Sequence, residues 1–340
     1  KSEGNAIGNY NRRLSFLLNV DYKIKSWLTT ISKFNFSTTK YKGISPFTGE
    51  ENYFSRNFSY PPTFRAYNNN GELILGKNSG DGNQQFLANA WDNDENRQKF
   101  MFSQDFKIKP FEDLIINFKG DWFYEFYNYE RFYRTYQTAP GQFNRSHNSS
   151  AQTQRNLTQT YNILFNYNKT FGDHSLSALL GWEYFHSKYG MLSGSGYNPN
   201  NNYFRDLQYT ITEEGARQLD SSHSKFITES YFMRLNYDYQ AKYIASFTVR
   251  RDGISKLGKD NRWGVFPGLS LGWVFTKEDF MKKYPWLSFG KLRTSFGRNG
   301  NVNENWVGNY TIQGAFAQSL YNGSQAFTLS SIPNYFLTWE

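Results

Sequence analysis

Residues 229–239 read Glu-Ser-Tyr-Phe-Met-Arg-Leu-Asn-Tyr-Asp-Tyr, and most of them alternate between apolar and polar. The apolar or aromatic positions are Tyr231, Met233, Leu235, Tyr237 and Tyr239, and the polar positions between them are Arg234, Asn236 and Asp238. A period of two places successive side chains on opposite faces of an extended strand. The stretch therefore predicts a strand with one apolar face and one polar face.

The same alternation recurs along most of the chain. It returns at 14–24, where Leu17 is the one apolar residue out of phase, and again at 114–126 and 269–275. On this basis we predict strands at 9–24, 27–41, 96–108, 113–131, 155–169, 174–192, 224–240, 242–252, 262–275 and 288–299, with an eleventh at 305–318. We expect one face to carry Leu18, Phe118, Leu235 and Leu271, and the other to carry Asn19, Lys119, Asn236 and Ser270.

Aromatic residues supply an unusual share of the apolar mass. The chain has 26 Tyr and 32 Phe and is 20% aromatic, yet hydrophobic residues reach only 38% and the mean hydropathy is -0.73. This composition suits a wall that meets lipid on one face and water on the other. No run approaches the roughly 18 to 20 apolar residues of a spanning helix, so only a closed β-barrel could cross a bilayer with its backbone paired. A soluble β-sandwich with aromatic hairpin ends is the alternative.

The connections between the predicted strands alternate between tight and long. Those at 25–26, 109–112, 171–173 and 240–241 are tight, whereas those at 43–95, 132–154 and 193–223 are long and polar. Outer-membrane barrels have short periplasmic turns and long outer loops. Aromatic residues also gather beside the tight turns, as an interfacial girdle would: Tyr22, Trp27, Phe111, Tyr167, Phe171, Tyr239, Tyr243 and Trp273. The fold class predicted is all-β, a partial transmembrane antiparallel β-barrel.

The direction of the first strand predicts that the barrel is incomplete. If the tight turns are periplasmic, that strand runs inward and Lys1 lies on the outer side. Bacterial single-chain barrels have even strand numbers, which puts both ends of a complete barrel on one side, so we expect further sequence upstream. The tail 331–340 lacks the terminal aromatic strand that usually closes such barrels, so we also expect sequence downstream. We expect a curved, open wall whose two edge strands are unpaired within this chain.

Charge and motifs argue against several other functions. The net charge of +9 is dispersed along the chain, which argues against nucleic-acid binding, and there is no cysteine. The four histidines, His147, His174, His186 and His223, show no metal-ligand spacing. We predict no catalytic residue and no metal site, except that Asp92, Asp94 and Glu95 could hold Ca²⁺ if they are not a solvated acidic loop.

Charged residues at inward positions are the candidate site. Strand parity points Arg13, Asp121, Glu125, Glu183, Arg234, Asp238 and Arg250 toward the lumen. They would contact substrate or a plug, or they would simply line a hydrated lumen. Aromatic residues of the predicted outer loops could stack on sugar or peptide groups, pack the loops together or meet a partner: Tyr53, Phe54, Tyr60, Trp91, Tyr136 and Tyr203.

One block of the chain resembles a known family. It consists of residues 229–239, Lys242-Tyr243, 250–253, 258–267, Gly272-Trp273, Phe280-Met281 and 291–297, which read as parts of the barrel of SusC/RagA-type TonB-linked outer-membrane proteins. The early segments Arg13-Leu14-Ser15-Phe16 and Trp27-Leu28 and the closing residues 337–340 look similar to other parts of that barrel.

The resemblance implies a 22-stranded barrel in the bacterial outer membrane, filled by an N-terminal plug. It also implies a SusD-like surface lipoprotein as a lid, and import of glycan or peptide fragments driven by TonB with ExbB and ExbD. Residues 1–340 would then be one section of a single barrel domain, with no plug in this sequence. A passive porin or structural barrel is the second reading, and a barrel enzyme is the third.

Overall fold

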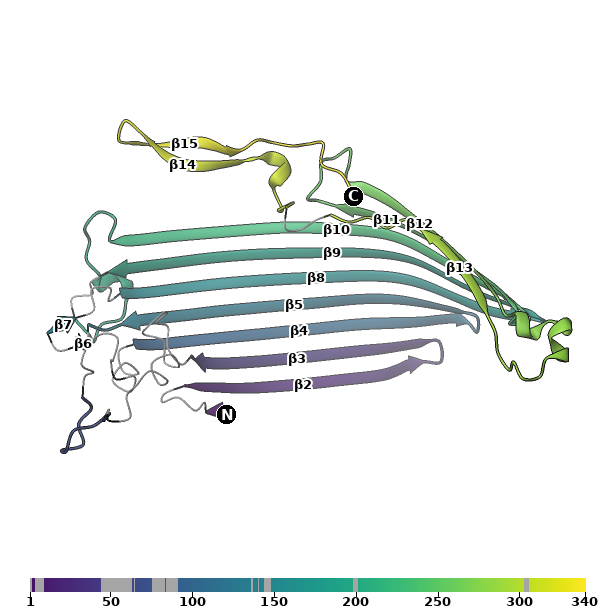
Figure 1. Cartoon of the computed structure of the whole chain (residues 1–340), viewed down its shortest axis with the longest axis horizontal. Helices are drawn as coiled ribbons and strands as arrows, with labels where there is room; N and C mark the ends of the chain where they lie inside the picture. The colour runs from purple at the N-terminus through teal and green to yellow at the C-terminus, as the bar shows by residue number, and fades with distance from the viewer. Residues whose placement is uncertain are drawn as a thin grey trace.

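The structure is a computed structural model. It describes residues 2–3, 9–43, 63, 65–74, 83, 91–135, 137–139, 141–143, 148–197, 201–302 and 306–340. Its main element is an antiparallel sheet of 11 strands in the order β1-β2-β3-β4-β5-β8-β9-β10-β11-β12-β13 (Figure 1). The strands are β1 (Ser2–Glu3), β2 (Tyr10–Lys25), β3 (Leu28–Lys42), β4 (Trp91–Phe111), β5 (Leu114–Tyr133), β8 (Asn148–Phe171), β9 (His174–Tyr197), β10 (Arg217–Tyr239), β11 (Tyr243–Ile254), β12 (Trp263–Trp273) and β13 (Leu292–Gly297).

Two small hairpins and four short 3₁₀ helices complete the described elements. The hairpins are β6 (Gln137–Ala139) with β7 (Gln142–Phe143), and β14 (Ala315–Tyr321) with β15 (Ser324–Ser331). The 3₁₀ helices are η2 (Leu207–Tyr209), η3 (Phe275–Lys277), η4 (Asp279–Lys283) and η5 (Thr311–Gln313). No helix within the described residues is long and apolar enough to span a membrane.

The ten strands predicted on alternation are all present. Four of them, β4, β8, β9 and β10, continue well beyond their predicted outer ends into segments that we expected to be loop. The eleventh prediction, a strand at 305–318, is wrong, because η5 ends at Gly314 in the left-handed region (φ 74°) before β14 begins. The Asn322-Gly323 turn, with both φ values positive, then folds β14 back on β15 outside the main sheet.

The sheet is an open wall, as predicted. β13 pairs with β12 and β2 pairs with β3, and no ladder joins β2 to β13 among the residues that the structure describes. One detail of the prediction is wrong, because the first edge is not wholly unpaired: Ser2 and Glu3 of β1 pair with the outer end of β2. Figure 1 shows the strands lying side by side and curving toward β11, β12 and β13.

Strand register sorts the side chains into two faces. Paired residues on neighbouring antiparallel strands point to the same side of a sheet, so the pairs can be followed from β2 to β13. Leu18, Phe118, Leu235 and Leu271 share one face, which we call the apolar face. Asn19, Lys119, Asn236 and Ser270 share the opposite face, which we call the polar face. The predicted alternation is confirmed.

A small buried core at the outer end ties the C-terminal segment to the sheet. Ile254, Leu257 and Val302 are buried together, with Leu337 and Trp339 packed against them. The Trp339 indole N–H donates to the carbonyl of Arg262 at 3.0 Å. These contacts attach the end of the chain to the β11–β12 connection.

At the end of the sheet with the tight turns, the Glu278 carboxylate links several segments. Glu278 lies in the β12–β13 connection and accepts hydrogen bonds from Lys242 Nζ at 2.5 Å, Tyr243 OH at 2.6 Å and Trp273 Nε1 at 2.9 Å. The hydrogen bonds, that of Lys242 first, lower the pKa of Glu278 to about 2. Glu278 therefore joins the β10–β11 turn to the connection that leads to β13.

Leu235 offers a direct test of the two faces. It lies midway along the apolar stretch of β10, between Tyr231 and Tyr239. We expect Leu235→Lys to destabilise the folded full-length protein by about 2 to 4 kcal/mol, because a charge near the middle of the bilayer must be desolvated. The matched variant Asn236→Lys, on the polar face, should cost much less. Denaturant unfolding in lipid vesicles measures both, and equal costs would contradict the assignment of faces.

Glu278 predicts a specific acid sensitivity. A depressed pKa in the folded state contributes stability that is complete above the unfolded pKa near 4.5 and is lost as the pH falls toward about 2. The wild-type protein should therefore unfold at a higher temperature than Glu278→Gln above about pH 5, and this difference should shrink at about pH 3. Heat-modified gel mobility of the full-length protein in detergent measures the two unfolding temperatures. An advantage that is independent of pH would argue against the ionised carboxylate.

Candidate functional site

The seven predicted lumen charges all lie on the polar face of the sheet. Register places them there with Asn19, Lys119 and Asn236. They are Arg13, Asp121, Glu125, Glu183, Arg234, Asp238 and Arg250. Their contact with substrate or plug stays a prediction, but their common face is a property of the fold.

Arg250 is the centre of the densest polar cluster on this face. Its guanidinium lies 2.6 Å from Asp252 Oδ1 and 3.3 Å from Glu183 Oε1, and it donates to Ser230 Oγ at 2.9 Å. It also covers the ring of Phe232, 5.1 Å from the ring centroid. These groups come from β9, β10 and β11, so the cluster bridges three strands. We call it the Arg250 cluster.

A glycine makes room for this arrangement. A Cβ on Gly181 would lie 2.3 Å from the Phe232 ring, so only glycine at this position of β9 lets the ring lie against the strand. Phe232 in turn supports the guanidinium of Arg250 from one side. The sequence predicted Glu183 and Arg250 by strand parity. It did not single out Ser230, Asp252 or Phe232, although all three have the same parity.

The remaining predicted acids have partners nearby. Asp121 forms an ion pair with Lys119 at 2.8 Å, and Glu125 lies 3.3 Å from Lys99 and 3.7 Å from Arg97. These pairs place both positive and negative charges on the polar face near the centre of the sheet. Ion pairs exposed to this degree contribute little stability.

Three other predicted residues act locally or have no polar contact. Asp238 Oδ1 accepts the N–H of Ala241 at 2.7 Å and so supports the tight β10–β11 turn, where Ala241 has a φ of 50°. Arg13 Nε donates to Ser15 Oγ on its own strand at 3.0 Å. No hydrogen bond or ion pair holds the Arg234 side chain within the described part of the chain. The structure thus brings together Glu183 and Arg250, places Arg234 in a hollow beside them, and leaves the other four apart.

Two hollows lie on the polar face. The first has a volume of about 560 Å³, and Asn19, Lys33, Asp105, Lys119 and Asp121 are among its lining residues. The second, of about 440 Å³, lies beside the Arg250 cluster and is lined by Arg234, Thr248, Phe266 and Asn299 among others. Both offer donors, acceptors and apolar contact, which is the lining that a hydrated organic ligand needs.

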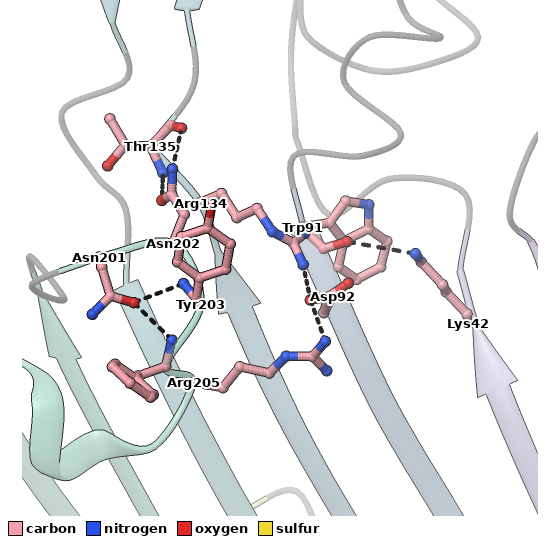
Figure 2. A network of polar contacts seen from close by, with 10 residues as sticks. Lys42, Trp91, Asp92, Arg134, Thr135, Asn201, Asn202, Tyr203 and Arg205 are labelled. Atoms are coloured by element: carbon pink, nitrogen blue, oxygen red, sulfur yellow. Dashed lines mark hydrogen bonds and ion pairs between the residues drawn. The ribbon is translucent and has the colours of Figure 1, made fainter.

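At the outer end, a polar network ties the connection before η2 to β4 and β5 (Figure 2). The Asp92 carboxylate pairs with Arg134 and, at 2.9 Å, with Arg205. Asn202 Oδ1 accepts the N–H of Thr135 at 2.7 Å, and its amide donates back to the Thr135 carbonyl at 3.0 Å. The network fixes where this outer connection lies above the wall.

The predicted outer aromatics divide into three groups. Trp91 is in β4, only 4% exposed, and stacks on Tyr133 with centroids 6.4 Å apart, so it packs the outer rim. Tyr203 is 87% exposed and available for contact. Tyr53, Phe54, Tyr60 and Tyr136 lie outside the described residues.

The possible Ca²⁺ loop is not a loop. Asp92, Asp94 and Glu95 belong to β4, where alternation turns Glu95 to the face opposite the other two. The Asp92 carboxylate is also occupied by two arginines. Over the described ranges, no three acidic or histidine side chains are grouped to hold a metal ion. His147 lies outside those ranges.

Comparison with known proteins gives related sequences. No protein-family model matches the chain. It is 33% identical over 199 residues to the TonB-dependent receptor SusC of Bacteroides thetaiotaomicron, covering 55% of this chain and 19% of that protein. It is 30% identical over 178 residues to the TonB-dependent receptor P39 of Formosa agariphila, covering 52% of this chain and 17% of that protein. The alignments thus span less than a fifth of these relatives.

Solved structures give the same fold. The structure of the RagAB peptide transporter superposes with a TM-score of 0.79 at 18% identity, over 97% of this chain and 37% of that chain. The RagAB peptide importer in its open-open state gives a TM-score of 0.80 at 18% identity, over 98% and 37%. The open sheet thus matches part of a larger barrel, and the resemblance seen in the sequence is confirmed. The sequence similarity is to receptors and not to enzymes. The chain belongs to the SusC/RagA-type TonB-dependent receptors and forms part of their outer-membrane β-barrel.

Proposed function

We propose that the protein imports glycan or peptide fragments across the outer membrane, with energy supplied through TonB, ExbB and ExbD. The observation that carries this proposal is the 33% identity to SusC over 199 residues, together with the fold shared with the RagAB peptide transporter. In this proposal residues 1–340 are one section of the barrel domain. The plug and the TonB-contacting segment belong to other parts of the receptor.

The polar face supports a role in moving hydrated substrates. Its two hollows and the Arg250 cluster provide hydrogen-bond donors and acceptors along the inside of the wall. Sugars and peptide backbones both present such groups, so the face fits either class. The seven lumen charges, with Arg250 at their densest point, would contact the substrate or the plug.

We infer that a SusD-like lipoprotein covers the outer end. The fold shared with the RagAB peptide transporter supports such a partner. The connection before η2 offers it Tyr203, 87% exposed, and Phe204, 53% exposed. The Asp92 network holds this connection in place, so the exposed rings have a defined position.

Energy coupling separates import from a passive pore. We expect accumulation of labelled oligosaccharides or peptides by cells carrying the full-length receptor to fall by about tenfold or more when the tonB gene is deleted or a protonophore is added. Co-purification of the receptor with a lipoprotein tests the lid. Uptake that continues unchanged without TonB would contradict active import and favour a passive porin.

Adjacent arginines allow a matched test of the polar face. Arg250 lies in the cluster, whereas Arg251 is on the apolar face over the Trp263 ring at 4.6 Å. We expect Arg250→Ala to slow uptake by about tenfold, because it leaves Glu183 and Asp252 without their cation. Arg251→Ala should leave uptake nearly unchanged. The surface abundance of each variant is measured as the control for folding. Equal uptake by the two variants at equal abundance would show that Arg250 has no role in transport.

A further inference from the structure

The apolar face carries an unusual pairing of like charges on three neighbouring strands. Lys188 of β9 and Lys225 of β10 are direct cross-strand partners. Arg155 of β8 pairs with Gly190, which makes it a diagonal neighbour of Lys188, about 7 to 8 Å away. Like charges placed opposite one another destabilise a sheet unless an anion or water compensates them.

The side chains of these three residues have no acidic partner among the residues that the structure describes. All three are exposed. No ion pair joins any of them to an acid among the described residues. The contact of Lys225 with Tyr310 uses its backbone N–H, at 3.0 Å, and leaves the ammonium group unused. The nearest acid of the apolar face, Glu229, already accepts hydrogen bonds from Trp182 and Tyr231.

Gly190 opens a notch between these cations. A Cβ at Gly190 would meet nothing within 4 Å, so the apolar face is bare at this point. Arg155 pairs with Gly190 on one side, and His223 pairs with it on the other. Lys188 and Lys225 occupy the next row of the same face toward the tight turns. An anion seated on the backbone here would be ringed by cationic side chains.

Aromatic rings on the same face indicate the depth of this notch in the membrane. Trp122, Tyr161, Tyr184 and Trp182 form a continuous row on the apolar face, with centroids 5.6 to 6.3 Å apart. Such a row is typical of a girdle at headgroup level. Lys188 lies about 13 Å beyond Tyr184 along β9, at about 3.3 Å per residue, in the direction away from the tight turns. Because barrel strands tilt by about 35–45°, this is about 10 Å along the membrane normal, so the cations lie beyond the girdle, at the outer surface of the outer leaflet.

We propose that Arg155, Lys188 and Lys225 bind the phosphate of a phosphorylated lipid of the outer leaflet at the Gly190 notch. The location on the lipid-facing side selects a lipid over a soluble anion, because the acyl chains of the same molecule continue onto the apolar band below. Lys and Arg at a membrane surface are attracted to anionic headgroups. His223 flanks the site and is available to donate to the same phosphate.

The experiment uses the full-length receptor in vesicles of phosphatidylethanolamine that contain either lipid A with its phosphates or enzymatically dephosphorylated lipid A. Lipid binding is measured by native mass spectrometry. We expect the double variant K188Q/K225Q to bind phosphorylated lipid A about tenfold more weakly than the wild type. Binding of the dephosphorylated lipid should be weak and equal for both. The double variant K23Q/K259Q, with the same change in charge at other exposed positions, should bind as the wild type does.

A second variant tests the notch without changing charge. Gly190→Leu fills the open space with a side chain that meets no neighbour, and we expect it also to weaken binding of the phosphorylated lipid. Heat-modified gel mobility shows that each variant is folded. Unchanged binding by both variants would overturn the proposal. If millimolar inorganic phosphate displaces the bound lipid as effectively as free lipid does, the cations form a site for an ion and not for a lipid. If the variants lose a bound protein and keep the lipid, the cations form a protein interface. Either result also overturns it.

Discussion

The hydrocarbon layer of a membrane contains no water to pair a backbone N–H or C=O, so each of these groups must find its partner within the protein. The uninterrupted antiparallel ladder from β2 to β13 meets this constraint for every interior strand. It also explains the tight turns at one end, because a turn such as that at Gln240 and Ala241 satisfies the ends of two strands at once. Among the residues that the structure describes, the edge strands β2 and β13 lack a neighbouring strand along most of one side. In the structure of the RagAB peptide transporter the matching region is 37% of the chain, and closure of a sheet into a barrel removes such edges.

Most of the wall could be predicted from the sequence because a period of two is a local signal. Alternation located ten strands and put Glu183 and Arg250 on the same face, and it needs no knowledge of contacts. The outer ends of β4, β8, β9 and β10 could not be found in this way, because beyond the bilayer both faces meet water and the alternation fades. The wrong strand at 305–318 has a similar cause. Gly308 and Gly314 interrupt that segment and the Asn322-Gly323 turn follows it, so these residues form turns although the segment contains apolar residues.

The sequence predicted on which face of the sheet the candidate site lies, but not which residues contact one another there. Parity gives the side of the sheet on which a residue lies, but the neighbours of that residue across the sheet depend on register, which the sequence does not state. Ser230 and Asp252 meet Arg250 only because β10 and β11 pair as they do. Glu278 is a similar case. Its partner Lys242 precedes β11, and its partner Trp273 ends β12. Only the folded structure shows that this one carboxylate accepts hydrogen bonds from three donors.

Charge and register constrain each other in this wall. A slip of one residue between two strands would turn every side chain of one strand to the opposite face. For β10 it would send Arg234 and Asp238 toward lipid, and for β9 it would send Glu183 there. Each charge moved into the bilayer costs about 2 to 4 kcal/mol near the midplane for a cation, whereas an exposed ion pair on the polar face contributes at most about 1 kcal/mol. The charges of the polar face therefore do little to hold the strands together, but they exclude the alternative registers. The cations above the girdle, such as Lys188 and Lys225, are tolerated on the apolar face because they lie beyond the depth at which that penalty applies.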